Sequence, residues 1–126
     1  MKSILLIEDD PFLIDIYTTK LKEAGFSVDL ATDGEQGLRK LVEKKFDLLL
    51  LDIVLPQIDG WEILNKIKNE KLKIKNFGDL KIVILSNLGQ KEEVEKGMKL
   101  GATKYLIKAH YTPSEVVEEI KKILYV

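Results

Sequence analysis

Four short runs of apolar residues, none of which alternates with polar residues, constrain the fold more than any other feature of this chain. They occupy residues 4–7, 48–51, 82–85 and 105–107. Continuous runs of this length are typical of strands buried on both faces, as in a parallel sheet covered by helices. Residues 27–31, around Val28 and Leu30, predict a fifth and weaker strand.

Amphipathic stretches with helix start and stop signals separate these runs. The first spans residues 12–24, begins after the cap Asp10-Pro11 and stops at Gly25. We expect further helices at 33–44, after Asp59, at 90–99 and after Thr112, and a lysine-rich loop at 66–81. Five alternating strand and helix units predict an α/β fold, a doubly wound parallel sheet with right-handed crossovers.

Composition fits one compact domain over residues 1–126 and excludes several classes of protein. The chain is 45% hydrophobic, has a formal net charge of −1 and contains no cysteine. The near-neutral charge favours neither direct nucleic-acid binding nor attraction to a membrane. No apolar run approaches the roughly 18 residues of a membrane span, and the N-terminal run is too short for a signal peptide. We therefore expect a cytoplasmic protein without membrane insertion.

Polar side chains follow the predicted strands, at the edge where open α/β sheets form their sites. They are Glu8, Asp9 and Asp10 after the first run, Asp52 after the second, Ser86 after the third and Lys108 after the fourth. Because the strands that precede Glu8 and Asp52 are commonly adjacent in this architecture, their carboxylates are expected to converge. Such a concentration of negative charge requires a cation.

The chemistry of these groups indicates a phosphoryl acceptor beside a metal ion. Hard carboxylate oxygens suit Mg²⁺, which is often completed by water and phosphate. A lysine ammonium and a hydroxyl nearby would bind the remaining phosphoryl oxygens. A carboxylate can itself be the nucleophile and form an aspartyl phosphate.

Four segments in order resemble the receiver domain of two-component response regulators. They are residues 4–10 (ILLIEDD), 47–60 (DLLLLDIVLPQIDG), 82–86 (IVILS) and 102–108 (ATKYLIK). The most specific is the Asp-x3-Pro-x2-Asp-Gly pattern that begins at Asp52. The resemblance covers nearly the whole chain and implies a flavodoxin-like receiver fold with strand order 2-1-3-4-5.

The resemblance also implies a role for each candidate residue. Asp52 is the phosphoacceptor nucleophile, Lys108 binds the phosphoryl group, and Ser86 is the switch hydroxyl. Tyr105 is the aromatic residue that changes rotamer on activation. Metal ligands are expected from Glu8, Asp9, Asp52 and the backbone carbonyl of Val54. Asp10, before Pro11, and Asp59 are interpreted as helix caps, and His110 as a loop residue.

The implied function is a phosphorylation-dependent signalling switch rather than an enzyme with a separate substrate. A sensor histidine kinase or a phosphotransfer protein would supply the phosphoryl group to Asp52 with Mg²⁺. The face formed by the fourth helix, the fifth strand and the fifth helix would then bind a downstream protein or an attached output domain. The chain fits either a stand-alone receiver or one excised from a longer regulator.

Three positions depart from the usual family pattern. Ala109 replaces the proline that normally follows the phosphate-binding lysine in a cis bond. A non-proline cis bond costs about 3 kcal/mol, so the placement of Lys108 is open. Asn87 replaces a small residue and could narrow access to Asp52 or add a hydrogen bond. Val54 and Leu88, two residues beyond Asp52 and Ser86, are apolar and cannot orient an attacking water, which predicts slow self-dephosphorylation.

Other functions fit the residues less well. A haloacid-dehalogenase-type phosphatase needs a second Asp two residues after the nucleophile, where this chain has Val54. A flavodoxin-type flavin carrier needs a neutral phosphate loop, which the acids at residues 8–10 do not provide. The remaining alternative is a pseudo-receiver, an interaction module that keeps the fold but is not phosphorylated.

Overall fold

A computed structural model describes residues 1–69, 73–76 and 78–125, and it contains the five predicted strand and helix units. The elements are β1 (Ser3–Ile7), α1 (Pro11–Glu23), β2 (Ser27–Ala31), α2 (Gly34–Glu43), β3 (Leu48–Leu51), α3 (Gly60–Lys68), β4 (Lys81–Ser86), α4 (Lys91–Lys99), β5 (Lys104–Ile107), a short 3₁₀ turn (Lys108–His110) and α5 (Pro113–Leu124). The strands form one parallel sheet in the order β2-β1-β3-β4-β5. The predicted fold class is confirmed.

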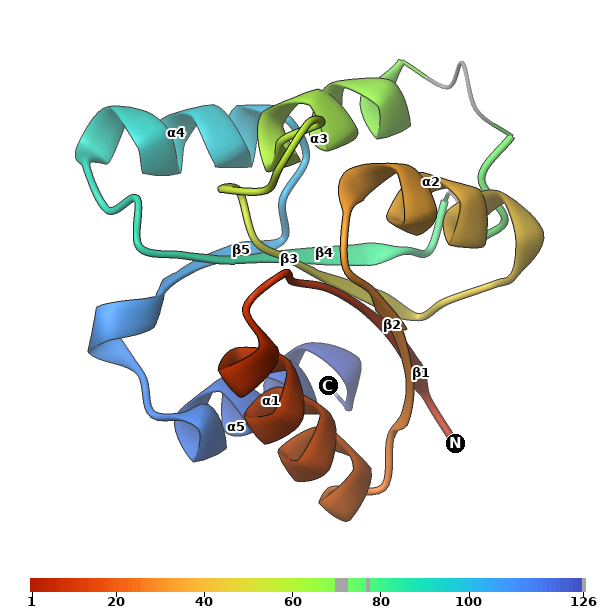
Figure 1. Cartoon of the computed structure of the whole chain (residues 1–126), viewed down its shortest axis with the longest axis vertical. Coiled ribbons are helices and arrows are strands. Elements are labelled where there is room, and N and C mark those ends of the chain that lie inside the picture. The colour runs from red at the N-terminus through yellow and green to blue at the C-terminus, as the bar shows by residue number, and fades with distance from the viewer. Residues whose placement is uncertain (70–72, 77, 126) are drawn as a thin grey trace.

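Helices cover both faces of the sheet, with α2, α3 and α4 on one side and α1 and α5 on the other (Figure 1). Alternate residues of each strand point to opposite faces. Leu5, Ile7, Leu49 and Leu51 therefore pack with α2 and α3, whereas Ile4, Leu6, Leu48 and Leu50 pack with α1 and α5. This two-sided burial explains why the apolar runs do not alternate.

Side-chain caps start the helices where the sequence predicted them. The carboxylate of Asp10 accepts from the amides of Phe12 and Leu13, and that of Asp59 accepts from the amide of Glu62. Both acids therefore serve as helix caps. The helix α3 extends to Lys68, so the loop expected at 66–81 begins later than predicted, and residues 70–72 and 77 of that loop lie outside the described residues. Among the described residues, no helix is long and apolar enough to cross a membrane.

Candidate functional site

Three acidic side chains meet at the carboxyl ends of two neighbouring strands. The strands β1 and β3 are paired up to Ile7 and Leu51, so the residues that follow them lie side by side. One carboxylate oxygen from each of Glu8, Asp9 and Asp52 lies within 4.8 Å of the others. Glu8 and Asp52 are buried, whereas Asp9 is exposed to solvent.

Lys108, directly after β5, reaches two of the acids that follow β1 and β3. Its Nζ lies 3.0 Å from Glu8 Oε1 and 3.1 Å from Asp52 Oδ2, and its side chain is only 12% exposed. The peptide bond between Lys108 and Ala109 is trans. Lys108 therefore reaches Asp52 without the proline that the family pattern usually has, because the chain turns here as a 3₁₀ segment.

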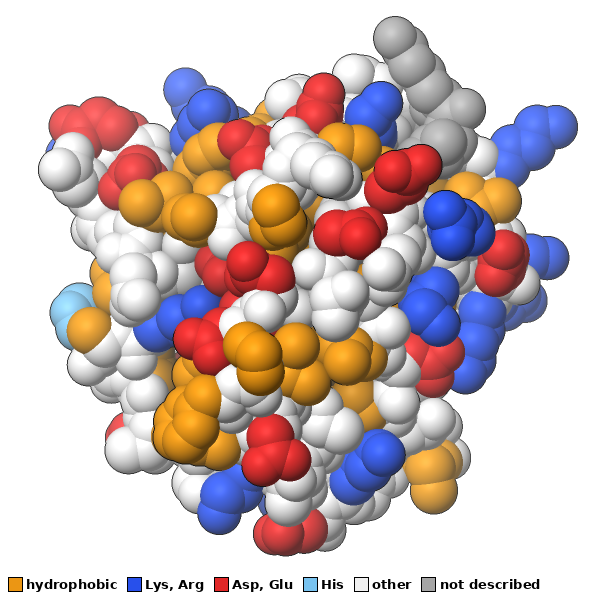
Figure 2. All heavy atoms as spheres, in the orientation of Figure 1, with side chains coloured by type: hydrophobic (Ala, Val, Ile, Leu, Met, Phe, Trp, Pro, Cys, Tyr) orange, Lys and Arg blue, Asp and Glu red, His pale blue; other side chains and the backbone are white. Residues whose placement is uncertain are grey.

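Burial and charge act together on this cluster. Burial, with the neighbouring charge of Asp52, raises the pKa of Glu8, and contact with Lys108 only partly offsets it. Burial alone would lower the pKa of Lys108, but the charges of Asp52 and Glu8 outweigh it and raise that pKa. Figure 2 shows acidic and basic side chains meeting between the two helical layers, with hydrophobic side chains beside them. The site therefore contains three carboxylates and one ammonium group, that of Lys108, which contacts two of them.

A second group of polar contacts joins the end of β4, the loop that follows it and β5. Ser86 is fully buried, and its Oγ accepts a hydrogen bond of 3.2 Å from the amide of Leu88. The hydroxyl of Tyr105 donates to the carbonyl oxygen of the same Leu88. Burial and the charge of Glu93 raise the pKa of Tyr105, and the Ser86 hydroxyl partly offsets this. The Tyr105 ring therefore points toward the β4–α4 loop.

Comparisons with known proteins identify this arrangement. A model of the response regulator receiver domain matches residues 4–121. This chain belongs to the response regulator receiver domain family. It is 34% identical over 125 residues to the alkaline phosphatase synthesis transcriptional regulatory protein PhoP of Bacillus subtilis, covering 98% of this chain and 48% of PhoP. The chain spans about half the length of the curated relatives that it matches.

Solved receiver structures share the whole fold. A CheY-like receiver domain protein from Methanospirillum hungatei is 28% identical with a TM-score of 0.86, covering 99% of this chain and 94% of the other. The response regulator TrrA of Thermotoga maritima, solved in complex with Mg²⁺ and BeF, is 31% identical with a TM-score of 0.82, covering 98% and 100% of the two chains.

Of the remaining candidate positions, Val54 contacts the three-acid cluster. The amide of Val54 donates to Asp52 Oδ1 at 3.3 Å, and the Val54 side chain is 60% exposed. Asn87 is also exposed. The metal role expected for the Val54 carbonyl stays a prediction. The cap residues Asp10 and Asp59 do not belong to the three-acid cluster.

Tyr17 is a neighbour of the site that sequence reasoning interpreted only as a core position of α1. It is 3% exposed, and burial raises its pKa while the charge of Lys108 lowers it. The charges of Glu8 and Asp52 also act on this phenol. Tyr17 lies seven residues after the cap Asp10, about two turns along α1, on the face that packs against the sheet together with α5. The sequence signal that could have identified Tyr17 is a phenol among the apolar positions of this helix.

Proposed function

We propose that this receiver domain, spanning residues 1–126, accepts a phosphoryl group on Asp52 from a sensor histidine kinase or a phosphotransfer protein. The observation that supports this most directly is the contact of Lys108 Nζ with both Glu8 and Asp52. A buried lysine between two carboxylates would be a costly way to stabilise a fold. It is well suited to binding an incoming phosphoryl oxygen.

The three acids fit Mg²⁺ by their chemistry and their mutual distances. Each offers a carboxylate oxygen within 4.8 Å of the other two, and hard oxygen ligands of this kind suit Mg²⁺. Glu8, Asp9, Asp52 and the Val54 carbonyl would hold the ion, which supplies positive charge to the phosphoryl oxygens. TrrA, a relative with the same fold, was solved with this metal.

In the proposed reaction, a carboxylate oxygen of Asp52 forms a bond to phosphorus. The bond from phosphorus to the donor nitrogen breaks, and the donor leaves with the electron pair. Lys108 neutralises charge on the transferred group, and Ser86 binds one of its oxygens. Apart from this transfer and the later hydrolysis, the domain has no substrate of its own, so we propose a signalling domain rather than an enzyme.

The proposed output is a change at the face of α4, β5 and α5. Ser86 and Tyr105 both contact Leu88, so a shift of the Ser86 hydroxyl toward phosphate changes the contacts of Tyr105. This face would bind a downstream protein or an attached output domain. PhoP is named a transcriptional regulatory protein, and this chain covers 48% of its length, which fits an attached output domain. A cytoplasmic location stays a prediction.

Intact-mass measurement tests the phosphorylation directly. The chain is incubated with acetyl phosphate or phosphoramidate and Mg²⁺, and we expect one phosphoryl group per chain. Asp52→Asn should abolish this gain, whereas Asp10→Asn and Asp59→Asn should retain it because both caps keep their oxygen acceptors. Chelation of Mg²⁺ should also abolish it.

The same experiment separates the switch from its alternative, the unphosphorylated pseudo-receiver. A folded chain that gains no mass with either donor would be a pseudo-receiver. A gain retained in Asp52→Asn would place the phosphoryl group on another residue. An unchanged Tyr105 environment in the beryllofluoride complex would contradict the proposed coupling to the output face.

A further inference from the structure

Helix α4 contacts the sheet through a glycine. Gly97 is its one buried residue in the described chain, and the other eight residues of the helix are exposed or half-buried. Glycine inside a helix costs about 1 kcal/mol relative to alanine. A glycine in this position therefore indicates a packing requirement.

The space that a side chain at residue 97 would need is already occupied. A Cβ on Gly97 would lie 2.7 Å from Ile84 Cδ1 and 2.9 Å from Tyr105 Cδ2. Ile84 and Tyr105 are paired neighbours on β4 and β5, so the backbone of α4 rests directly on this pair. Contacts this short would force one of the groups to move.

Of these two groups, the half-buried Tyr105 ring has more open space to move into than the enclosed Ile84 methyl group. Ile84 is fully buried in an interior strand, whereas Tyr105 is half-buried on the edge strand β5. In this structure the Tyr105 hydroxyl is bonded to the Leu88 carbonyl, and one edge of the ring lies against Gly97. The absence of a side chain at residue 97 therefore permits this position.

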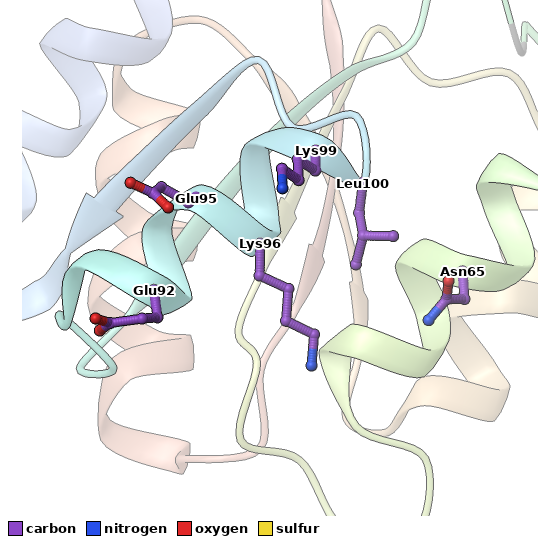
Figure 3. Close-up of a pocket in the computed structure, with 6 residues that line it drawn as sticks. All are labelled: Asn65, Glu92, Glu95, Lys96, Lys99 and Leu100. Carbon is purple, nitrogen blue, oxygen red and sulfur yellow. The ribbon is translucent and has the colours of Figure 1, made fainter.

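The lysine side chains between α4 and α3 make only solvent-exposed contacts. Lys96 points from α4 toward α3 across an open cleft of about 430 Å³ (Figure 3), and its Nζ lies 4.5 Å from the ring centroid of Trp61. Lys68 Nζ donates to the carbonyl of Lys99 at 3.1 Å. Exposed contacts of this kind are weak. Gly97 is the buried residue of α4 in the described chain, so its contact limits how close the helix lies to Tyr105.

We propose that Gly97 is a positioning residue of the output switch, because its missing side chain lets Tyr105 turn inward beneath α4. A side chain there would hold Tyr105 outward and disconnect it from the phosphorylation state. This inference rests on the proposed function only for its signalling consequence. The steric relation between Gly97 and Tyr105 holds with or without phosphorylation.

The test is a variant Gly97→Ala with Tyr105 observed by NMR in protein containing ¹³C-labelled tyrosine. The Tyr105 resonance is assigned from its absence in Tyr105→Phe. We expect Gly97→Ala to shift this resonance in the metal-free protein and to reduce its further shift on adding Mg²⁺ and beryllofluoride. The rate of Asp52 phosphorylation by acetyl phosphate should not change. Lys99→Ala, on the exposed side of the same helix, should leave the resonance as it is.

A double-mutant comparison of melting temperatures keeps the proposal testable if Gly97→Ala folds poorly. Gly97→Ala should lower the melting temperature of the parent chain, but not that of Tyr105→Ala, where the ring is absent. An equal loss in both backgrounds would identify Ile84 as the obstacle and overturn the proposal. An unshifted Tyr105 resonance in Gly97→Ala would also overturn it. Failure of phosphorylation in the parent chain would refute the proposed function. The melting temperatures and the Tyr105 resonance of the metal-free protein would still test the role of Gly97.

Discussion

The two ends of the receiver site differ in how firmly they are held. The acidic half consists of Glu8 and Asp52, which are buried after the interior strands β1 and β3, and Lys108, which follows β5 and forms an ion pair with each of them. The switch half, Ser86, Leu88 and Tyr105, is joined by neutral hydrogen bonds and ends at the edge strand β5. Charges held together by ion pairs suit a chemical step, whereas a half-buried ring held by one neutral hydrogen bond suits a change of position.

Loss of the Lys108 charge should have the largest effect, and it acts on the acidic half. Lys108→Met should slow phosphorylation by acetyl phosphate by about 10²- to 10³-fold, because a charge that stabilises the transferring group is removed. It also leaves Glu8 and Asp52 without a nearby lysine, which should lower the free energy of unfolding by about 3 kcal/mol in metal-free protein. Time-resolved intact mass and denaturant unfolding in EDTA measure the two effects.

A variant of Lys104, at the start of the strand that precedes Lys108, serves as the control. Lys104→Met removes an ion pair with Glu119 whose lysine is 43% exposed, and it should leave the phosphorylation rate unchanged. Mg²⁺ should restore more stability to Lys108→Met than to Lys104→Met, since the ion would replace the lost cation. Equal effects of Mg²⁺ on both variants would contradict the assignment of the acidic half as a metal site.

A polar side chain at residue 54 should shorten the lifetime of the phosphorylated state. The Val54 side chain is exposed beside Asp52 and has no group that binds water. In Val54→Asn, an amide could orient the attacking water, and a barrier lower by about 1.4 kcal/mol would speed hydrolysis about tenfold. Phosphate release from the purified phosphorylated chain measures this rate. Val54→Leu is the control, and an equal lifetime in all three chains would refute slow self-dephosphorylation through Val54.

Removal of the buried Glu8 charge should affect stability and metal binding in opposite directions. Burial and the charge of Asp52 raise the pKa of Glu8 in the folded metal-free protein. As pH falls, Glu8 therefore gains a proton at a higher pH in the folded protein than in the unfolded chain. The stability contributed by Glu8 is thus complete below its unfolded value near 4.5 and is lost as pH rises through the higher folded value. Glu8→Gln should therefore raise the free energy of unfolding of the metal-free protein at neutral pH.

Two measurements test these opposite effects of Glu8→Gln on stability and on metal binding. Denaturant unfolding in EDTA should show that the advantage of Glu8→Gln disappears as pH falls toward the unfolded pKa. Adding Mg²⁺ should stabilise the parent chain more than the variant. Asp9→Asn, at the exposed acid of the cluster, should weaken the Mg²⁺ effect without the gain in metal-free stability. A loss of metal-free stability in Glu8→Gln would mean that the contact with Lys108 outweighs burial.

The acidic half was also the easier half to predict from sequence. Acids directly after the runs 4–7 and 48–51 are visible in the chain, and the parallel pairing of β1 and β3 brings them together. Whether Lys108 contacts Asp52 could not be predicted, because Ala109 replaces the usual proline. The chain direction after β5 then depends on a backbone turn that no single residue type specifies. The position of Tyr105 was hidden for a related reason. Its partner is the backbone carbonyl of Leu88, and every residue has a carbonyl.

Loss of the Tyr105 hydroxyl should have the smallest effect and should be confined to the switch half. Tyr105→Phe keeps the ring beside Gly97 but removes the hydrogen bond to Leu88, so we expect a loss of about 0.5–1 kcal/mol in unfolding free energy. The phosphorylation rate should stay at the parent value, because the hydroxyl does not contact Lys108 or Asp52 in the described structure. A rate that fell as far as in Lys108→Met would show that the two halves act as one unit. A parent-like rate with a weakened response of the α4–β5–α5 face would show that chemistry and output are separable, and would place Tyr105 on the output side.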